Sequence, residues 1–97
     1  MKFILIAHDK PGGLEVRKAA RPAHLAYLQA AGETIVFGGP MLSADGAPFG
    51  SVVVIEAEDE TAARAFFEGD PYVEAGLFEM VSVSAFRVVI EKGVLAG

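Results

Sequence analysis

The chain has 97 residues, of which 53% are hydrophobic and 22% are charged, and its formal net charge is −5 at pH 7. This length suits one domain with a hydrophobic core, spanning residues 1–97, and the hydrophobic content argues against disorder. Nucleic-acid affinity comes mostly from basic side chains that neutralise phosphates, and the chain has only eight Lys and Arg. We therefore expect a single folded domain with no nucleic-acid partner.

The chain contains no cysteine. This rules out disulfides, thiolate nucleophiles and cysteine-bound metal centres, and it is typical of a reducing compartment. Apolar runs such as Val52–Ile55 are far too short to cross a bilayer. The segment Phe3–Ala7 is also too short for the apolar part of a secretion signal. The sequence therefore predicts a soluble, cytoplasmic protein with no membrane partner.

The first third of the chain predicts a strand followed by a helix. Lys2–His8 alternates two apolar sets, as a buried strand does, and Asp9–Gly13 interrupts it. Leu14–Ala31 has helical preferences, and the glycine after it is a natural stop. Pro22 leaves two alternatives. Either the stable helix begins near Arg21, with the proline in its first turn, or a short helical turn before the proline ends in a kink.

The rest of the chain predicts three more strands and a second helix. The strands are rich in Ile, Val and Phe and span Glu33–Gly39, Gly50–Ala57 and about Glu79–Ile90. A polar hairpin loop, Ser43–Pro48, joins the first two of them. Asp59 is placed to cap a helix over Glu60–Glu68, which Gly69-Asp70-Pro71 ends.

The resulting order, βαββαβ, is the split pattern of the ferredoxin-like sandwich, an α+β fold in which two helices cover one face of an antiparallel sheet. The first three predicted strands carry apolar side chains at both odd and even positions, so both sheet faces require burial. Two helices can cover only one face. We therefore predict a homodimer whose sheets pack face to face. The alternative is that these strands are simply rich in valine.

One imidazole and one carboxylate form a candidate acid–base site. A carboxylate that faces one ring nitrogen of histidine fixes the tautomer and leaves the other nitrogen free to move a proton near neutral pH. His24 lies ten residues past Leu14, and Asp70 lies eleven past Asp59. We expect both helices to begin at the same end of the sheet, which places the two residues level, about 15 to 17 Å along neighbouring helices. Helix axes about 8 to 10 Å apart let such side chains meet. The match weakens if the first helix begins at Arg21.

The candidate residues also have structural interpretations. A pair between His24 and Asp70 can be a satisfied polar contact that locks the turn at Pro71. Arg17 and Arg21 lie near one helical face with the histidine, where they hold an anionic substrate or remain solvated charges.

Two aromatic residues and one serine complete the candidate site. Tyr27 and Tyr72 either flank an aromatic ligand or pack in the core. Ser51 opens the third predicted strand and is the one serine suited to a place beside the base, but no motif supports a catalytic triad. The residues assigned to substrate binding are Arg17, Arg21, Ser51 and Tyr72.

The sequence predicts no cofactor and no metal site. His8 and Asp9 are adjacent on a strand and point to opposite faces, so they do not easily join His24 on one ion. Lys10–Gly13 lies between a strand and a helix but lacks both nucleotide-binding fingerprints. The third predicted strand also lacks the aromatic platform with which RNA-recognition domains stack bases.

Five segments, in this order and spacing, resemble the YCII-related (YciI-like) family: Arg17, Arg21–Leu28, Gly38-Gly39-Pro40, Gly50-Ser51 and Asp70–Leu77. The resemblance covers the chain from Phe3 to about Val89. It implies a ferredoxin-like fold of the dimeric α+β barrel group, which includes muconolactone isomerase and small monooxygenases. It also implies a His–Asp catalytic pair at His24 and Asp70, but it supplies no firm reaction.

Two functional hypotheses follow. The first is a cofactor-free enzyme, an isomerase or lyase, in which His24, oriented by Asp70, moves a proton on a small oxygenated or aromatic-derived metabolite. The second is a non-catalytic dimeric module that binds a metabolite or a partner protein. Titration of His24, and its response to a ligand, distinguishes the two.

Overall fold

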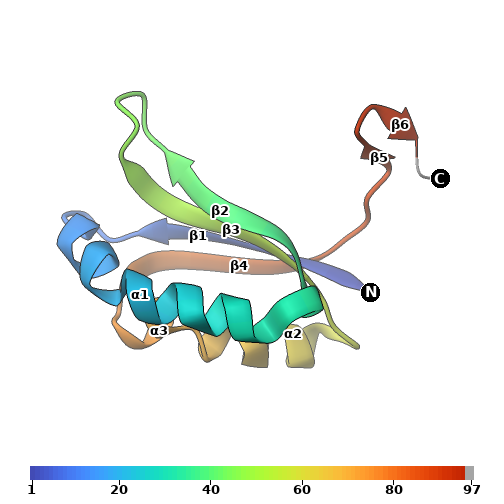
Figure 1. The fold of residues 1–97 in the computed structure, drawn as a ribbon, viewed down its shortest axis with the longest axis horizontal. Coiled ribbons are helices and arrows are strands. Elements are labelled where there is room, and N and C mark those ends of the chain that lie inside the picture. The colour runs from blue at the N-terminus through green and yellow to red at the C-terminus, as the bar shows by residue number, and fades with distance from the viewer. Residues whose placement is uncertain (96–97) are drawn as a thin grey trace.

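A computed structural model describes residues 1–95 of the protein. Its main body is a four-stranded sheet with strand order β2-β3-β1-β4, and the helices lie along one face of this sheet (Figure 1). The strands are β1 (Lys2–Asp9), β2 (Ile35–Leu42), β3 (Pro48–Glu56) and β4 (Phe78–Phe86). The helices are α1 (Leu14–Ala31), a 3-10 turn (Gly32–Thr34), α2 (Glu60–Glu68) and α3 (Pro71–Glu74). The predicted α+β, ferredoxin-like fold is confirmed, with α3 as an element that the sequence did not predict.

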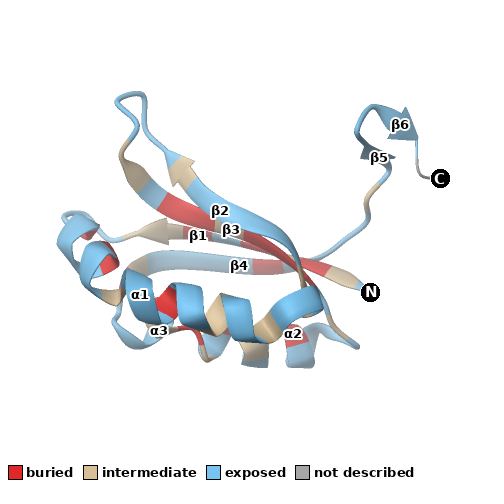
Figure 2. Ribbon diagram, in the orientation of Figure 1, coloured by how far each residue is buried: buried red, intermediate tan, exposed pale blue. Residues whose placement is uncertain are grey.

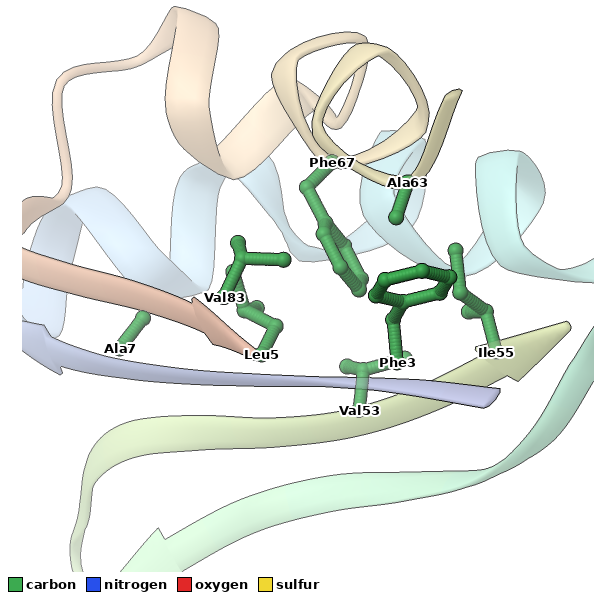
Figure 3. Close-up of a cluster of buried hydrophobic side chains, with 8 residues drawn as sticks. All are labelled: Phe3, Leu5, Ala7, Val53, Ile55, Ala63, Phe67 and Val83. Carbon is green, nitrogen blue, oxygen red and sulfur yellow. The ribbon is translucent and has the colours of Figure 1, made fainter. Parts of the chain in front are cut away.

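The hydrophobic core lies between the sheet and α2. Phe3 and Leu5 of β1 are buried because alternate residues of a strand point to the same face. They pack against Ala63 and Phe67 of α2 (Figure 3). Asp59 begins this helix by accepting a hydrogen bond from the backbone N–H of Ala62 at 2.8 Å, as predicted for its cap. The core therefore fixes α2 against the centre of the sheet.

The two long helices begin at opposite ends of the sheet. β1 and β3 are antiparallel neighbours, so the helix that follows each strand starts where the other strand begins. Figure 1 shows α1 and α2 running in opposite directions. The expectation that both helices begin at the same end is wrong, because the connection from β2 to β3 is a hairpin that reverses the chain.

Helix α1 is continuous across its proline. It runs from Leu14 to Ala31 with Pro22 inside, so the alternative in which the helix begins near Arg21 is wrong. Proline removes one hydrogen-bond donor from a helix interior. The helix tolerates this loss because Pro22 and most of its neighbours in α1 are exposed or half-buried. Its buried side chains are two polar ones, Arg17 and His24.

The last strand of the sheet is shorter than predicted. β4 ends at Phe86, whose pairing with Lys2 is the last between β1 and β4. Residues 87–89 then lead to a separate hairpin of β5 (Ile90–Glu91) and β6 (Val94–Leu95). This hairpin projects away from the main body (Figure 1). The predicted continuation of the strand to residue 90 is therefore wrong.

The sheet face opposite the helices is apolar and open. Ile4, Val54 and Phe37 form one cross-strand row on this face, and Phe37 is 53% exposed. Met80 lies on the same face and is 61% exposed. Figure 2 shows the contrast between the buried segments of β1 and β3 and the exposed β2. Among residues 1–95, no helix has the length and apolar character needed to span a membrane.

Candidate functional site

A buried histidine and a buried carboxylate join α1 to α3. His24 Nδ1 lies 2.8 Å from Asp70 Oδ1 and 2.9 Å from Oδ2. Asp70 is the N-cap of α3, and its Oδ1 also accepts the backbone N–H of Tyr72 at 2.9 Å. Pro71 follows it in the first turn of α3, where proline's fixed φ suits the helix and its missing N–H costs nothing. The cap therefore holds the carboxylate in place for the imidazole.

The hydrogen-bond geometry fixes the orientation and tautomer of the ring. An ionised carboxylate can only accept hydrogen bonds, so Nδ1 of His24 carries the proton and donates it to Asp70. Within residues 1–95, Nε2 makes no protein hydrogen bond, and no fully buried side-chain nitrogen or oxygen lacks a partner. His24 as a whole is 8% exposed, and Nε2 is the ring nitrogen that solvent can reach. A neutral Nε2 in this position can accept a proton.

An aromatic stack holds the face of the imidazole. The rings of Tyr72 and His24 are 3.8 Å apart between centroids and inclined by 14°. The guanidinium carbon of Arg17 lies 4.8 Å from the centroid of the Tyr72 ring, a distance at which a cation is attracted to the ring face. Arg17, Tyr72 and His24 therefore form a continuous series of contacts from α1 to α3 and back to α1.

Arg17 is anchored by the end of β1. Its Nε and Nη2 donate to Asp9 Oδ2 and Oδ1 at 2.8 and 2.9 Å, a bidentate ion pair in which both side chains are buried. Nη2 also donates to Ser51 Oγ at 3.0 Å. Burial alone would lower the pKa of the Arg17 guanidinium, but the hydrogen bonds and charge of Asp9 outweigh it and raise that pKa further. Arg17 therefore stays charged under all ordinary conditions.

The phenol of Tyr72 is kept protonated by its surroundings. Burial raises the pKa of Tyr72 above its ordinary value, and the positive charges of Arg17 and Arg21 offset this only in part. The negative charge of Asp70 acts in the same direction as burial. The ring that stacks on the imidazole is therefore neutral across the physiological range.

A pocket of about 330 Å³ opens beside these residues, between the inner face of α1 and strands β2 and β3. Arg17, Arg21, His24, Ser51 and Tyr72 all line it. The rest of the lining includes apolar side chains of α1 and the glycine and proline backbone of β2: Leu14, Leu25, Leu28, Gly38, Gly39 and Pro40. The structure thus brings five of the sequence-predicted residues to one cavity.

Tyr27 lies apart from this pocket. Its hydroxyl donates to the backbone carbonyl of Phe66 at 2.6 Å, and the two rings are 5.1 Å apart. A Cβ on Gly69 would lie only 2.5 Å from the Tyr27 hydroxyl oxygen, so any other residue there would displace this hydroxyl. Tyr27 joins α1 to the end of α2, which agrees with the structural interpretation of this residue.

The role of Asp9 was not predicted from the sequence, where this residue was considered only for a metal site. The structure pairs it with Arg17. An acid that directly follows a buried strand, with an arginine one turn into the next helix, was the available signal. Asp9 continues the alternation of Phe3, Leu5 and Ala7 along β1, so its carboxylate faces the helices. In the part of the chain that the structure describes, no group of three or more His, Asp or Glu side chains is arranged to hold a metal ion.

Residues 1–87 match the YCII-related domain. The chain belongs to the YCII-related family. Within this family it is 42% identical to the protein YciI of Escherichia coli, in an alignment that covers 92% of this chain and 99% of that protein. The predicted family is therefore confirmed over nearly the whole chain.

Solved structures support the same assignment. This YCII-related protein is similar to the 5-chloro-2-hydroxyhydroquinone dehydrochlorinase TftG of Burkholderia phenoliruptrix, which was crystallised with 2,5-dihydroxybenzoquinone. The two are 38% identical, with a TM-score of 0.84 and coverage of 90% of this chain and 94% of that one. SnoaB, a cofactor-independent oxygenase of Streptomyces nogalater, shares the fold at 11% identity, with a TM-score of 0.54 and coverage of 94% of each chain.

The YCII-related fold also explains why His24 and Asp70 meet. The prediction placed them level on helices that run in the same direction, which is not their arrangement. Instead, His24 lies past the middle of α1, and Asp70 lies just beyond the end of the oppositely directed α2. His24 lies about 15 Å along α1 from one end of the sheet, and Asp70 lies about 16 Å from the opposite end. Together these two distances roughly equal the length of the sheet, so the two residues come to the same level. Helix α3 then turns the Asp70 carboxylate toward α1.

Proposed function

We propose that this protein is a cofactor-free small-molecule enzyme in which His24 acts as a general base and then as a general acid. The observation that carries the proposal is the orientation of one ring: Nδ1 is fixed by Asp70 while Nε2 is left free beside the pocket. A positioned base of this kind contributes about 10²- to 10⁴-fold to a proton-transfer reaction.

The proposed reaction begins when Nε2 removes a proton from a carbon or oxygen of the substrate. The resulting imidazolium is stabilised by the carboxylate of Asp70, which accepts its Nδ1–H. The electron pair left on the substrate moves into its conjugated system. An isomerase returns the proton from Nε2 to another atom of the substrate. A lyase uses the electron pair to expel a leaving group as an anion, and Nε2 then releases its proton to solvent.

One relative supports elimination, the lyase reaction, over isomerisation. TftG is named for a dehydrochlorination, the removal of hydrogen and chloride, and it was crystallised with a quinone. Membership of the same family at 38% identity supports a small oxygenated ring compound as the substrate class here. The pocket has room for a molecule of about that size, because its volume lies at the lower end of the range for ligand sites.

The test uses 5-chloro-2-hydroxyhydroquinone and chlorine-free hydroquinones as first substrates. Chloride release and exchange of substrate hydrogen with deuterium from solvent are measured together, since a general base gives exchange even without net reaction. We expect His24→Gln to lower the rate by about 10²- to 10⁴-fold while the protein stays folded. His8→Gln is the control for residue type, because His8 lies on β1 near Phe49, outside the pocket. Light scattering on this variant checks that the assembly is unchanged, since His8 pairs with Met80 on the open sheet face.

Two outcomes would contradict the catalytic role. Full turnover in a folded His24→Gln protein would show that the imidazole is not the base. Saturable binding of these compounds with neither exchange nor turnover in the unaltered protein would instead favour the non-catalytic binding module. Stability is measured on the same preparations, so that loss of fold is not mistaken for loss of chemistry.

We also propose that the protein works as a homodimer in the cytoplasm, with the open sheet faces packed together. The support is the apolar row that includes Ile4 and the 53% exposed Phe37 on that face. Light scattering at micromolar concentration is expected to give twice the chain mass, and Phe37→Asp is expected to shift it toward the single-chain mass. A stable, well-folded monomer of the unaltered chain would contradict this assembly.

A further inference from the structure

We propose that the pocket beside His24 selects a planar organic anion, and that the guanidinium of Arg21 forms an ion pair with its charged group. The inference deepens the proposed function by naming the substrate class, and it rests on that function only for the reaction, since binding is tested separately. Three sets of observations carry it: the sign of the lining charges, the freedom of one cation, and the shape of the walls.

The charged lining of the pocket has one sign. The chain as a whole carries thirteen acidic and eight basic residues, yet the pocket lining includes Arg17, Lys18 and Arg21 and no Asp or Glu. The two acids nearest to the site, Asp9 and Asp70, are already held by Arg17 and His24. An acidic protein has therefore concentrated positive charge at one cavity, and such a field favours anions.

The three cations differ in how far they are committed to protein partners. Arg17 donates three of its five guanidinium N–H groups, two to Asp9 and one to Ser51, and the Asp9 carboxylate balances its charge. Lys18 has an exposed contact with Glu15 at 3.5 Å, a type of pair that contributes little. Arg21 has no ion-pair partner among residues 1–95, yet its charge reaches the site, where it acts on the phenol of Tyr72. Arg21 is thus the lining cation whose charge no carboxylate among residues 1–95 balances.

Arg21 is also well placed along the helix. It precedes His24 by three residues, and side chains three apart in a helix lie on the same face. Both residues line the pocket. An anion paired with this guanidinium therefore lies near Nε2, and positive charge at that point stabilises the additional negative charge that develops when a proton is removed.

The walls of the pocket favour a flat molecule. Leu25 and Leu28 of α1 line one side, and the backbone of Gly38-Gly39-Pro40 in β2 lines the other. A Cβ on Gly38 would lie 3.1 Å from the Val52 carbonyl oxygen and 3.3 Å from Val53, so a side chain fits there only if these neighbours shift. Gly38 and Gly39 therefore add no side chains to this wall, which is bare backbone at these two positions. A ring that carries its charge at one edge fits between apolar walls with that edge toward Arg21.

The test is an NMR titration with benzoate and benzamide, which share a ring and differ in charge. Benzoate is expected to bind at least tenfold more tightly than benzamide and to perturb amides of α1 and β2. Arg21→Gln is expected to remove that difference, and Lys18→Gln to reduce it less. Arg64→Gln is the matched control, because Arg64 is an exposed arginine of α2 paired with Glu60 at 2.9 Å.

The outcomes separate this inference from the catalytic proposal. Equal affinity for benzoate and benzamide, no binding of benzoate, or the same loss in Arg64→Gln would overturn the anion selectivity. The titration is repeated on His24→Gln, which retains Arg21 and is expected to keep the preference for benzoate. Retained binding with unchanged turnover in that variant would overturn the catalytic role alone.

Discussion

Helices α1 and α2 cover the same face of one sheet but bury opposite kinds of side chain. α2 buries Ala63 and Phe67 against the strands, whereas the buried residues of α1 are Arg17 and His24. A helix that packs on a sheet ordinarily presents an apolar stripe. The difference shows that one helix holds the fold together and that the other shields a polar site between itself and the sheet.

The largest expected effect tests the structural side of this comparison. Phe67→Ala removes a 5% exposed ring from the core and is expected to lower the free energy of unfolding by about 3 to 5 kcal/mol. Leu25→Ala on α1 is the counterpart, and because Leu25 is 43% exposed we expect a loss of about 1 kcal/mol or less. Urea denaturation of both variants decides the matter. Equal losses would show that α1 carries as much of the core as α2.

The next effect concerns the buried ion pair on α1. Asp9→Asn leaves the Arg17 guanidinium charged and buried without its carboxylate, which is expected to cost about 3 kcal/mol in the free energy of unfolding. Adding Arg17→Met is expected to recover much of this loss, because no buried charge then remains. A double variant as unstable as Asp9→Asn alone would show that the pair stabilises the fold by more than mutual neutralisation.

A smaller effect distinguishes the two roles of Asp70. Asp70→Ala removes both the cap on Tyr72 N–H and the partner of His24, at an expected cost of about 1 to 2 kcal/mol. Asp70→Asn keeps an oxygen that can cap the helix, so its cost is expected to be lower. The ¹⁵N shifts of the His24 ring report the tautomer, which we expect to change in both variants. An unaltered tautomer in Asp70→Ala would mean that the carboxylate does not orient the ring.

The smallest effect appears at alkaline pH. Burial raises the pKa of both Tyr27 and Tyr72, so above the unfolded value of about 10 the unfolded chain loses protons that the folded chain retains. The free energy of unfolding therefore falls as pH rises past about 10, and it is unaffected by these groups below that point. Tyr27→Phe and Tyr72→Phe are each expected to flatten this decline. A decline that neither substitution changes would assign it to other groups.

Sequence patterns were sufficient for the order of the strands and long helices, and they named five of the residues that line the pocket but not the role of Asp9. Alternation in β1 and the Asp59 cap of α2 are local signals, and both hold in the structure. The end of β4 depends instead on where β1 stops offering partners at Lys2, which no local pattern in residues 87–90 records. The pairing of Asp9 with Arg17 likewise depends on how α1 packs on the sheet, so it needed the structure.

Asp70 serves both the backbone and the site, because its Oδ1 accepts hydrogen bonds from the backbone N–H of Tyr72 at the start of α3 and from Nδ1–H of His24. A substitution that removes this oxygen alters the chemistry of the pocket and also disturbs the turn that leads the chain into β4. Evolutionary change of the reaction within this scaffold is therefore easier at residues such as Arg21. Arg21 lines the cavity and forms no ion pair with any other residue of the described chain. Divergence of substrate preference should accordingly begin at the mouth of the pocket and leave its interior pair in place.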